Sequence, residues 1–187
     1  MRWLIMVVID KLELNPFPSV VPLNGSTEIY LTPGQYFLGG SGYQVRTLLG
    51  SCVAITLWHQ GLRFGAMSHF MLSSRPLKTQ NPNTPLSDTE LDGKYADEVM
   101  LLIAQELHEA HIPISECQAK IFGGSNMFSN RNISEQCDIG FKNGLAARRL
   151  LANYNIPLVS ENLFGFTHRE IIFNLANGDV WVRQAKE

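Results

Sequence analysis

A cysteine, Cys52, follows a Gly50-Ser51 pair and precedes the strand-like run VAITLWH. A thiol that attacks a carbonyl must be partly ionised, which requires a pKa below about 8.5 through a nearby cation, base or turn. The Gly50-Ser51 turn could expose the sulfur, and its backbone N–H groups could stabilise an oxyanion. A free cysteine in an apolar run is, taken alone, more often a core residue. Cys52 therefore indicates chemistry only if a partner lies close to it.

His69, in the segment GAMSHFML, is the candidate partner. An imidazole among small and apolar residues is costly unless its nitrogens find hydrogen-bond partners. If the strands that carry Cys52 and His69 are neighbours, the histidine can act as general base toward the thiol and later protonate the leaving amine. A hydroxyl could orient the imidazole, and both Thr47 and Ser51 are close enough in the sequence to supply it. The residue pattern leaves that choice open.

Other candidate residues carry weaker signals. His108 and His111 form an HxxH pair in a predicted helix, but helical zinc pairs are usually four residues apart with a third ligand, so we expect no metal site. The glycine-rich segment 122–128 (FGGSNMF) follows neither the phosphate-loop nor the dinucleotide pattern. It predicts either a close backbone approach beside the active site or an ordinary loop. Cys117 and Cys137 have no evident partner, and we expect both to be inert.

The composition is that of a soluble globular protein. The chain has 187 residues, 45% hydrophobic and 17% charged, with a net charge of −2, which fits a single domain. Scattered lysines and arginines argue against nucleic acid as a partner. Three cysteines without a CxxC pair indicate a reducing, cytoplasmic compartment. The apolar start MRWLIMVVID is too short to span a bilayer and has no cleavage site after it, so we expect no membrane insertion.

Strand-like segments alternate with two helical ones. Residues 12–27 are rich in Pro, Asn, Gly and Ser and predict a loop. Strands are predicted in EIYLT, QYFLGG, VRTLL, VAITLWH, FGAMSHFML, CQAKIFGG, IPLVSENLFG and HREIIFNLANGDVWVRQ, the last with a hairpin at Asn177-Gly178. The polar stretch 73–94 predicts a long surface loop. Helices are predicted from Tyr95, with apolar residues at three- and four-residue spacing, and over residues 139–154.

The second predicted helix has Phe141, Leu145 and Leu150 among its apolar positions. Strands in quick succession suggest an antiparallel or mixed sheet. With two helices to cover it, the pattern predicts the α+β class, with helices packed outside one or two sheets.

Several segments match a known family in order and spacing. The blocks RTLLGSCVAITLWH, GLRFGAMSHFML, AKIFGGSNMF and HREIIFNLANGDVWVR resemble the CheD family of chemoreceptor glutamine deamidases, over residues 28–184. The resemblance implies that Cys52 is the nucleophile, His69 the catalytic histidine and Thr47 the third residue. It also implies a layered fold of mixed sheets flanked by helices, like that of deamidating-toxin-type cysteine hydrolases. We expect a deamidase domain over 28–187, preceded by an N-terminal extension or flexible lead-in over 1–27.

The family activity is hydrolysis of glutamine side-chain amides in methyl-accepting chemotaxis receptors, with release of ammonia, during chemotaxis adaptation. The resemblance implies this amidohydrolase activity in the cytoplasm, without cofactor or metal. We expect backbone amides near Gly50, Ser51 and Cys52 to hold the oxyanion. The 73–94 loop is expected to form one wall of a shallow groove around Cys52. The alternative is a regulatory binding module that docks to a CheC-like phosphatase or to receptors. A cysteine protease or transglutaminase is a further enzyme alternative.

Overall fold

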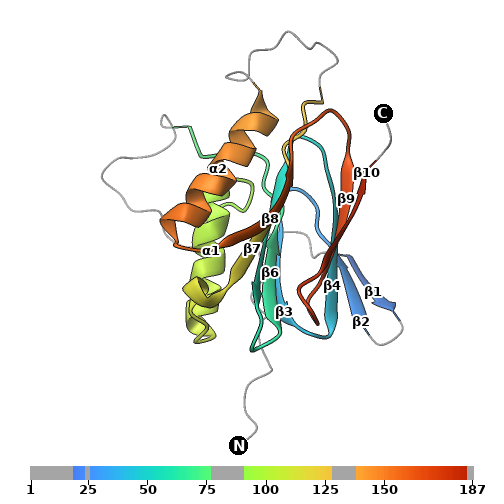
Figure 1. Cartoon of the computed structure of the whole chain (residues 1–187), viewed down its shortest axis with the longest axis vertical. Coiled ribbons are helices and arrows are strands. Elements are labelled where there is room, and N and C mark those ends of the chain that lie inside the picture. The colour runs from blue at the N-terminus through green and yellow to red at the C-terminus, as the bar shows by residue number, and fades with distance from the viewer. Residues whose placement is uncertain (1–18, 24–25, 77–90, 128–137, 185–187) are drawn as a thin grey trace, which may run out of the picture.

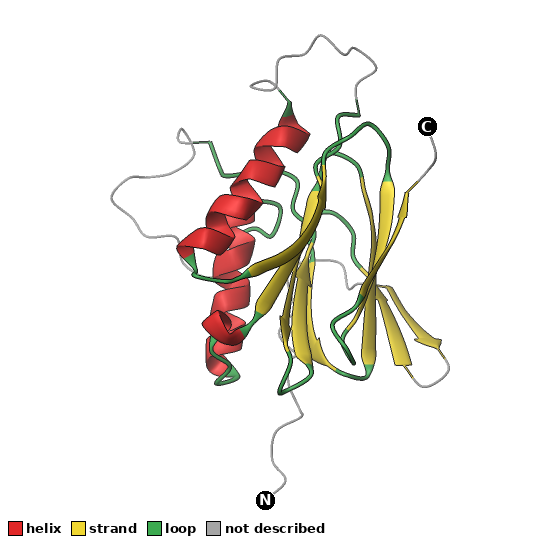
Figure 2. Ribbon diagram, in the orientation of Figure 1, coloured by secondary structure: helices red, strands yellow, loops and turns green. Residues whose placement is uncertain are grey.

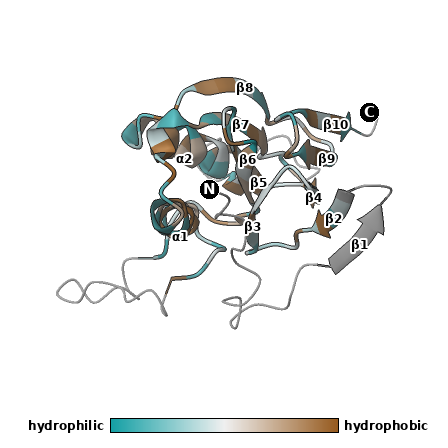
Figure 3. Ribbon diagram, turned by 90° about the horizontal axis from the view of Figure 1, so that it is seen from below, coloured by the Kyte–Doolittle hydropathy of each residue, from teal (hydrophilic) through white to brown (hydrophobic). Residues whose placement is uncertain are grey.

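The computed structural model describes residues 19–23, 26–76, 91–127 and 138–184. In this part of the chain, a layer of two helices, a five-stranded sheet and a second five-stranded sheet lie one behind the other (Figures 1 and 2). Figure 3, seen from below, shows the first sheet between the helices and the second sheet. The predicted α+β class, with mixed sheets flanked by helices, is confirmed. The likeness to the deamidating-toxin fold stays a prediction.

Both sheets mix parallel and antiparallel pairs. The sheet beside the helices has the order β3 (Tyr36–Gly40), β6 (Phe64–Ser68), β5 (Val53–His59), β7 (Gln118–Gly123) and β8 (Leu158–Leu163). The second sheet has the order β1 (Ser19–Leu23), β2 (Ser26–Tyr30), β4 (Tyr43–Leu49), β9 (Arg169–Asn174) and β10 (Val180–Gln184). The helices are α1 (Ala96–Glu109) and α2 (Ile139–Asn153), and a 3-10 turn, η3, spans Ile114–Glu116. Among the described strands, only β7–β8 and β2–β4 pair in parallel.

Strand β5 is buried on both faces because it lies in the middle layer. Val53, Ile55 and Leu57 point toward the helices and join the core beneath them. Ala54, between them in the sequence, belongs instead to the core between the two sheets. Burial on both faces explains why VAITLWH is a nearly continuous apolar run. It also places Cys52, the residue just before the strand, at the edge of the layer between the sheets.

The predicted helices are confirmed with small changes at their ends. Helix α1 begins one residue after Tyr95 and buries Val99, Ile103 and Leu107, whose four-residue spacing agrees with the predicted helical pattern. Helix α2 ends at Asn153, and the Asp138 carboxylate caps its start by accepting two N–H bonds at 2.7 and 3.2 Å. Within the described ranges, neither helix is long and apolar enough to cross a membrane.

The predicted loop over 12–27 is wrong at residues 19–23, which form β1 and pair antiparallel with β2, and at residues 26 and 27, which begin β2. The segment SVVPL has two adjacent valines, which favour extended backbone, and Asn24-Gly25 stands between the two strands in the sequence. Residues 1–18 lie outside the described part, so the domain boundary near residue 27 stays a prediction. The hairpin predicted at Asn177-Gly178 is confirmed, because β9 and β10 pair antiparallel around it.

Candidate active site

Strand register brings Cys52 and His69 to one face of the middle sheet. Val53 and Phe70 exchange two backbone N–H···O bonds, each 3.0 Å long. Cys52 and His69 are therefore diagonal neighbours on the face that looks toward the second sheet. Diagonal neighbours have Cβ atoms roughly 7 Å apart, a gap that an imidazole can bridge. Cys52 is half-buried, whereas His69 is only 2% exposed.

Thr47 reaches the histidine from the opposite sheet. It is fully buried in β4, between the inward-facing residues Val45 and Leu49. Its Oγ1 lies 2.7 Å from His69 Nδ1 and donates a 2.7 Å hydrogen bond to the Leu31 carbonyl. Of the two hydroxyls that the sequence left open, the structure places that of Thr47 against the imidazole.

These two contacts fix the tautomer of His69. A carbonyl oxygen can only accept, so the single hydroxyl proton of Thr47 goes to Leu31. Thr47 Oγ1 must then accept the Nδ1–H of His69, and a neutral imidazole has no second proton for Nε2. Nε2 is buried, and it has no hydrogen-bond partner in the described part of the chain. His69 therefore presents a free lone pair, which is what a base needs to accept a proton from a thiol.

Burial sets the charge state of the pair. Burial lowers the pKa of His69 to about 4, and the Leu31 carbonyl opposes this with a smaller effect. Burial also raises the pKa of the Cys52 thiol, against a smaller lowering by its own backbone N–H. The lowered thiol pKa that the sequence argument required is thus not found. At neutral pH the resting pair is a neutral thiol beside a neutral imidazole.

The depressed pKa of His69 predicts a loss of stability in acid. The pKa is 6.5 in the unfolded chain and about 4 in the folded one, so below pH 6.5 the unfolded chain binds the proton first. Between pH 7 and pH 4.5 this lowers the free energy of unfolding by about 2 kcal/mol. In His69→Gln the free energy of unfolding should not show this loss between pH 7 and pH 4.5. Urea unfolding at both pH values tests this, and equal losses in the two proteins would contradict it.

The described part of the glycine-rich segment, residues 122–127, lies against residues 50–52, the turn that carries Cys52 and is called the nucleophile turn. The Gly124 N–H donates to the Cys52 carbonyl and the Ser125 N–H donates to the Gly50 carbonyl, each at 2.8 Å. Gly123 has φ +114, and a Cβ at this position would lie 2.1 Å from the Cys52 carbonyl oxygen. Of the two alternatives for FGGSNMF, the close backbone approach beside Cys52 is therefore confirmed.

Asn143, on α2, is a residue that the sequence argument missed. Its side chain is 1% exposed, and its Nδ2 donates to the Ser51 carbonyl at 3.0 Å and to the Met71 carbonyl at 2.7 Å. Ser51 precedes Cys52, and Met71 lies two residues after His69. Asn143 thus ties together the two segments that carry the candidate pair. A single polar residue in a helix was too weak a signal to find it from the sequence.

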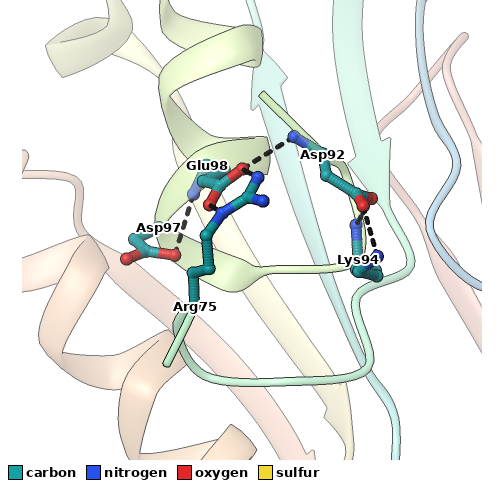
Figure 4. Close-up of polar contacts among 5 residues, drawn as sticks. All are labelled: Arg75, Asp92, Lys94, Asp97 and Glu98. Carbon is teal, nitrogen blue, oxygen red and sulfur yellow. Dashed lines mark hydrogen bonds and ion pairs between the residues drawn. The ribbon is translucent and has the colours of Figure 1, made fainter. Parts of the chain in front are cut away.

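The base of the long polar loop is clamped to α1 (Figure 4). Arg75 donates to both carboxylate oxygens of Glu98 through Nε and Nη2, each at 2.7 Å. The Asp92 N–H donates to the same carboxylate at 2.7 Å, and Glu98 is only 5% exposed. Residues 77–90 lie outside the described part, so a groove wall formed by this loop stays a prediction. Both ends of the segment are nevertheless held at one point of the helix.

The remaining candidates lie apart from this constellation. Cys117 is buried, and burial raises its pKa to about 11, which fits an unreactive thiol. Cys137 is outside the described residues. His108 and His111 are exposed at the end of α1. Within the described ranges, no three His, Cys, Asp or Glu side chains gather closely enough to hold a metal ion.

Comparison with known proteins supports the resemblance found in the sequence. Residues 71–184 match the family model described as CheD chemotactic sensory transduction. A protein of Albidiferax ferrireducens, named "Probable chemoreceptor glutamine deamidase CheD 2", is 48% identical over 157 residues, which cover 84% of this chain and 87% of that protein. The chain belongs to the CheD family.

Two further relatives carry the same family name at lower identity. The Chromobacterium violaceum protein "Probable chemoreceptor glutamine deamidase CheD 1" is 36% identical over 91% of this chain and 84% of its own length. A Pseudomonas savastanoi pv. phaseolicola protein, "Probable chemoreceptor glutamine deamidase CheD", is 42% identical over 85% of each chain. The predicted family is therefore confirmed, and its members are named for deamidation of chemoreceptor glutamines.

Proposed function

We propose that this CheD family member is a cytoplasmic protein-glutamine deamidase that converts glutamines of methyl-accepting chemotaxis receptors to glutamates during adaptation. The names of its relatives support the substrate and the reaction. The observation that carries the proposal is the arrangement of Thr47 and His69, which leaves the His69 Nε2 lone pair free on the face that carries Cys52.

In the first half-reaction, His69 Nε2 takes the Cys52 proton as the sulfur attacks the glutamine δ-carbonyl carbon. The C–S bond forms, and the carbonyl π electrons move to the oxygen. Thr47 Oγ1 keeps accepting the Nδ1–H, which stabilises the imidazolium. When the intermediate collapses, the C–N bond breaks, and Nε2–H protonates the nitrogen, which leaves as ammonia. A thioester between Cys52 and the former glutamine remains.

In the second half-reaction, Nε2 takes a proton from water as the water oxygen attacks the thioester carbonyl. The C–S bond then breaks, the sulfur regains its proton from Nε2, and the product is glutamate. The scheme needs a neutral histidine at the start of each half. The pKa of about 4 supplies it at neutral pH.

The test is conversion of receptor glutamines by wild-type protein and by Cys52→Ala, followed by peptide mass spectrometry of a receptor cytoplasmic domain. We expect Gln-to-Glu conversion with the wild type alone. Absence of conversion with the wild type, while binding to receptor or to a CheC-like phosphatase persists, would favour the regulatory binding module. Conversion that continues in Cys52→Ala would overturn the assignment of the nucleophile.

Thr47→Val is expected to lower the deamidation rate constant about 100-fold, at the lower end of what general base catalysis contributes. Valine has the shape of threonine but cannot accept the Nδ1–H, so the tautomer and the direction of the imidazole are lost. Thr47→Ser keeps the hydroxyl and should retain most of the rate. Single-turnover rates measure the effect, and equal rates for the valine and serine variants would show that the hydroxyl does not orient His69.

A further inference from the structure

Helix α2 places a polar side chain against the nucleophile turn, at a position where packing alone would favour an apolar one. Its other buried residues are Gly140, Gly144, Ala147 and Leu151. Asn143 Nδ2 donates to two carbonyl oxygens, which can only accept, so the orientation of the amide is fixed. Its Oδ1 is buried and has no partner among the described residues. An unpaired buried oxygen costs stability, so the amide needs a reason other than packing.

The Ser51 carbonyl and the Cys52 N–H belong to one planar peptide group and point in opposite directions. By holding that carbonyl at 3.0 Å, Asn143 fixes the direction of the Cys52 N–H. The next peptide plane is held as well, since Gly124 donates to the Cys52 carbonyl. The two peptide groups that flank the Cys52 Cα are therefore both held by hydrogen bonds to their carbonyl oxygens.

The Ser51 carbonyl points toward Asn143 on α2, so the Cys52 N–H points away from the helix, toward the side of the sheet on which the Cys52 side chain packs. The same backbone group lowers the pKa of the thiol. The carbon under attack becomes bonded to that sulfur, so its oxygen develops negative charge beside the same N–H. A donor placed in advance at such a position stabilises a tetrahedral intermediate. The second hydrogen bond of Asn143, to the Met71 carbonyl at 2.7 Å, joins its side chain to the segment that carries His69.

We propose that Asn143 is a positioning residue, which aims the Cys52 N–H at the oxyanion. This inference rests on the proposed deamidase function. Gly50 and Ser51, expected from the sequence to support the oxyanion, supply the carbonyls by which the turn is held.

The experiment compares Asn143→Ala with Thr56→Val. Thr56 is 2% exposed, and its hydroxyl donates to the Lys120 carbonyl at 3.2 Å, farther along β5 from Cys52. The control therefore also removes a buried side-chain donor to a carbonyl. For each protein we would measure kcat and KM for receptor deamidation, together with alkylation of the Cys52 peptide by iodoacetamide. Alkylation needs the thiol and its base but forms no oxyanion.

Asn143→Ala should lower kcat about 100-fold, the loss typical of one oxyanion donor, with KM and the Cys52 alkylation rate nearly unchanged. Thr56→Val should change neither rate. An unchanged kcat, or kcat and alkylation falling together, would overturn the inference. If the alanine variant does not fold, Asn143→Ser must show the same split between kcat and alkylation. Wild-type protein that converts no glutamine overturns the proposed function itself, whereas equal conversion by wild type and variant overturns only the role of Asn143.

Discussion

Replacing His69 with glutamine is expected to slow receptor deamidation about 1,000-fold, within the range that a general base contributes. The reason lies in the charge state of the pair. Burial raises the pKa of Cys52 and lowers that of His69 to about 4, so little thiolate exists at neutral pH without the base. Glutamine can still contact Thr47, but it has no lone pair basic enough to take the thiol proton.

Single-turnover conversion of receptor glutamine measures this loss, and iodoacetamide labelling of Cys52 should slow in parallel, because both reactions need the proton removed. His59→Gln is the matched control. His59 is a partly exposed histidine at the far end of β5, and its Nε2 lies 3.0 Å from Glu116 Oε2. A loss of less than tenfold in His69→Gln, or an equal loss in the control, would show that another group activates the thiol.

Most strands could be predicted from the sequence, because burial on one or both faces produces an alternating or continuous run of apolar residues. The buried face of α2 could not be predicted in the same way. Its predicted apolar positions, Phe141, Leu145 and Leu150, are half-buried or exposed. Gly140 and Gly144 lie inside instead, because a Cβ on either would come within 2.6 Å of the Gly124 oxygen or the Phe164 ring. Close approach to a neighbouring segment requires small residues at both positions, and the hydrophobic periodicity of the helix does not reveal such an approach.

In the candidate site, too, some contacts could be predicted from the sequence and others could not. Cys52 precedes β5 and His69 follows β6, and these two paired strands are joined by a single turn, so their proximity followed from local strand order. Thr47 lies in the other sheet, and its contact with His69 depends on how the two sheets pack. The residue pattern therefore could not choose between Thr47 and Ser51, and only the family resemblance did so. The pKa directions depend on burial, which the sequence around Cys52 did not reveal.

Gly123→Ala is expected to destabilise the protein by about 4 kcal/mol, a large part of the total stability of a domain. A side chain is strained at φ +114, and the new Cβ would lie 2.1 Å from the Cys52 oxygen and 3.0 Å from Val53 Cα. Both contacts are backbone atoms of the paired segment, so no side chain can rotate away. Relief must come from separating β7 from the start of β5, where Val53 and Gly123 are register partners.

That separation would also loosen the hydrogen bonds that Gly124 and Ser125 make to the nucleophile turn, so deamidation should fall with stability. The midpoint of urea unfolding measures the first effect and receptor conversion the second. Gly42→Ala is the control, because a Cβ there would meet nothing within 4 Å. An unfolding midpoint for Gly123→Ala equal to that of Gly42→Ala would contradict the prediction. It would mean that the glycine-rich segment can move away from Cys52 at little cost, and hence that its contact does not hold the turn in place.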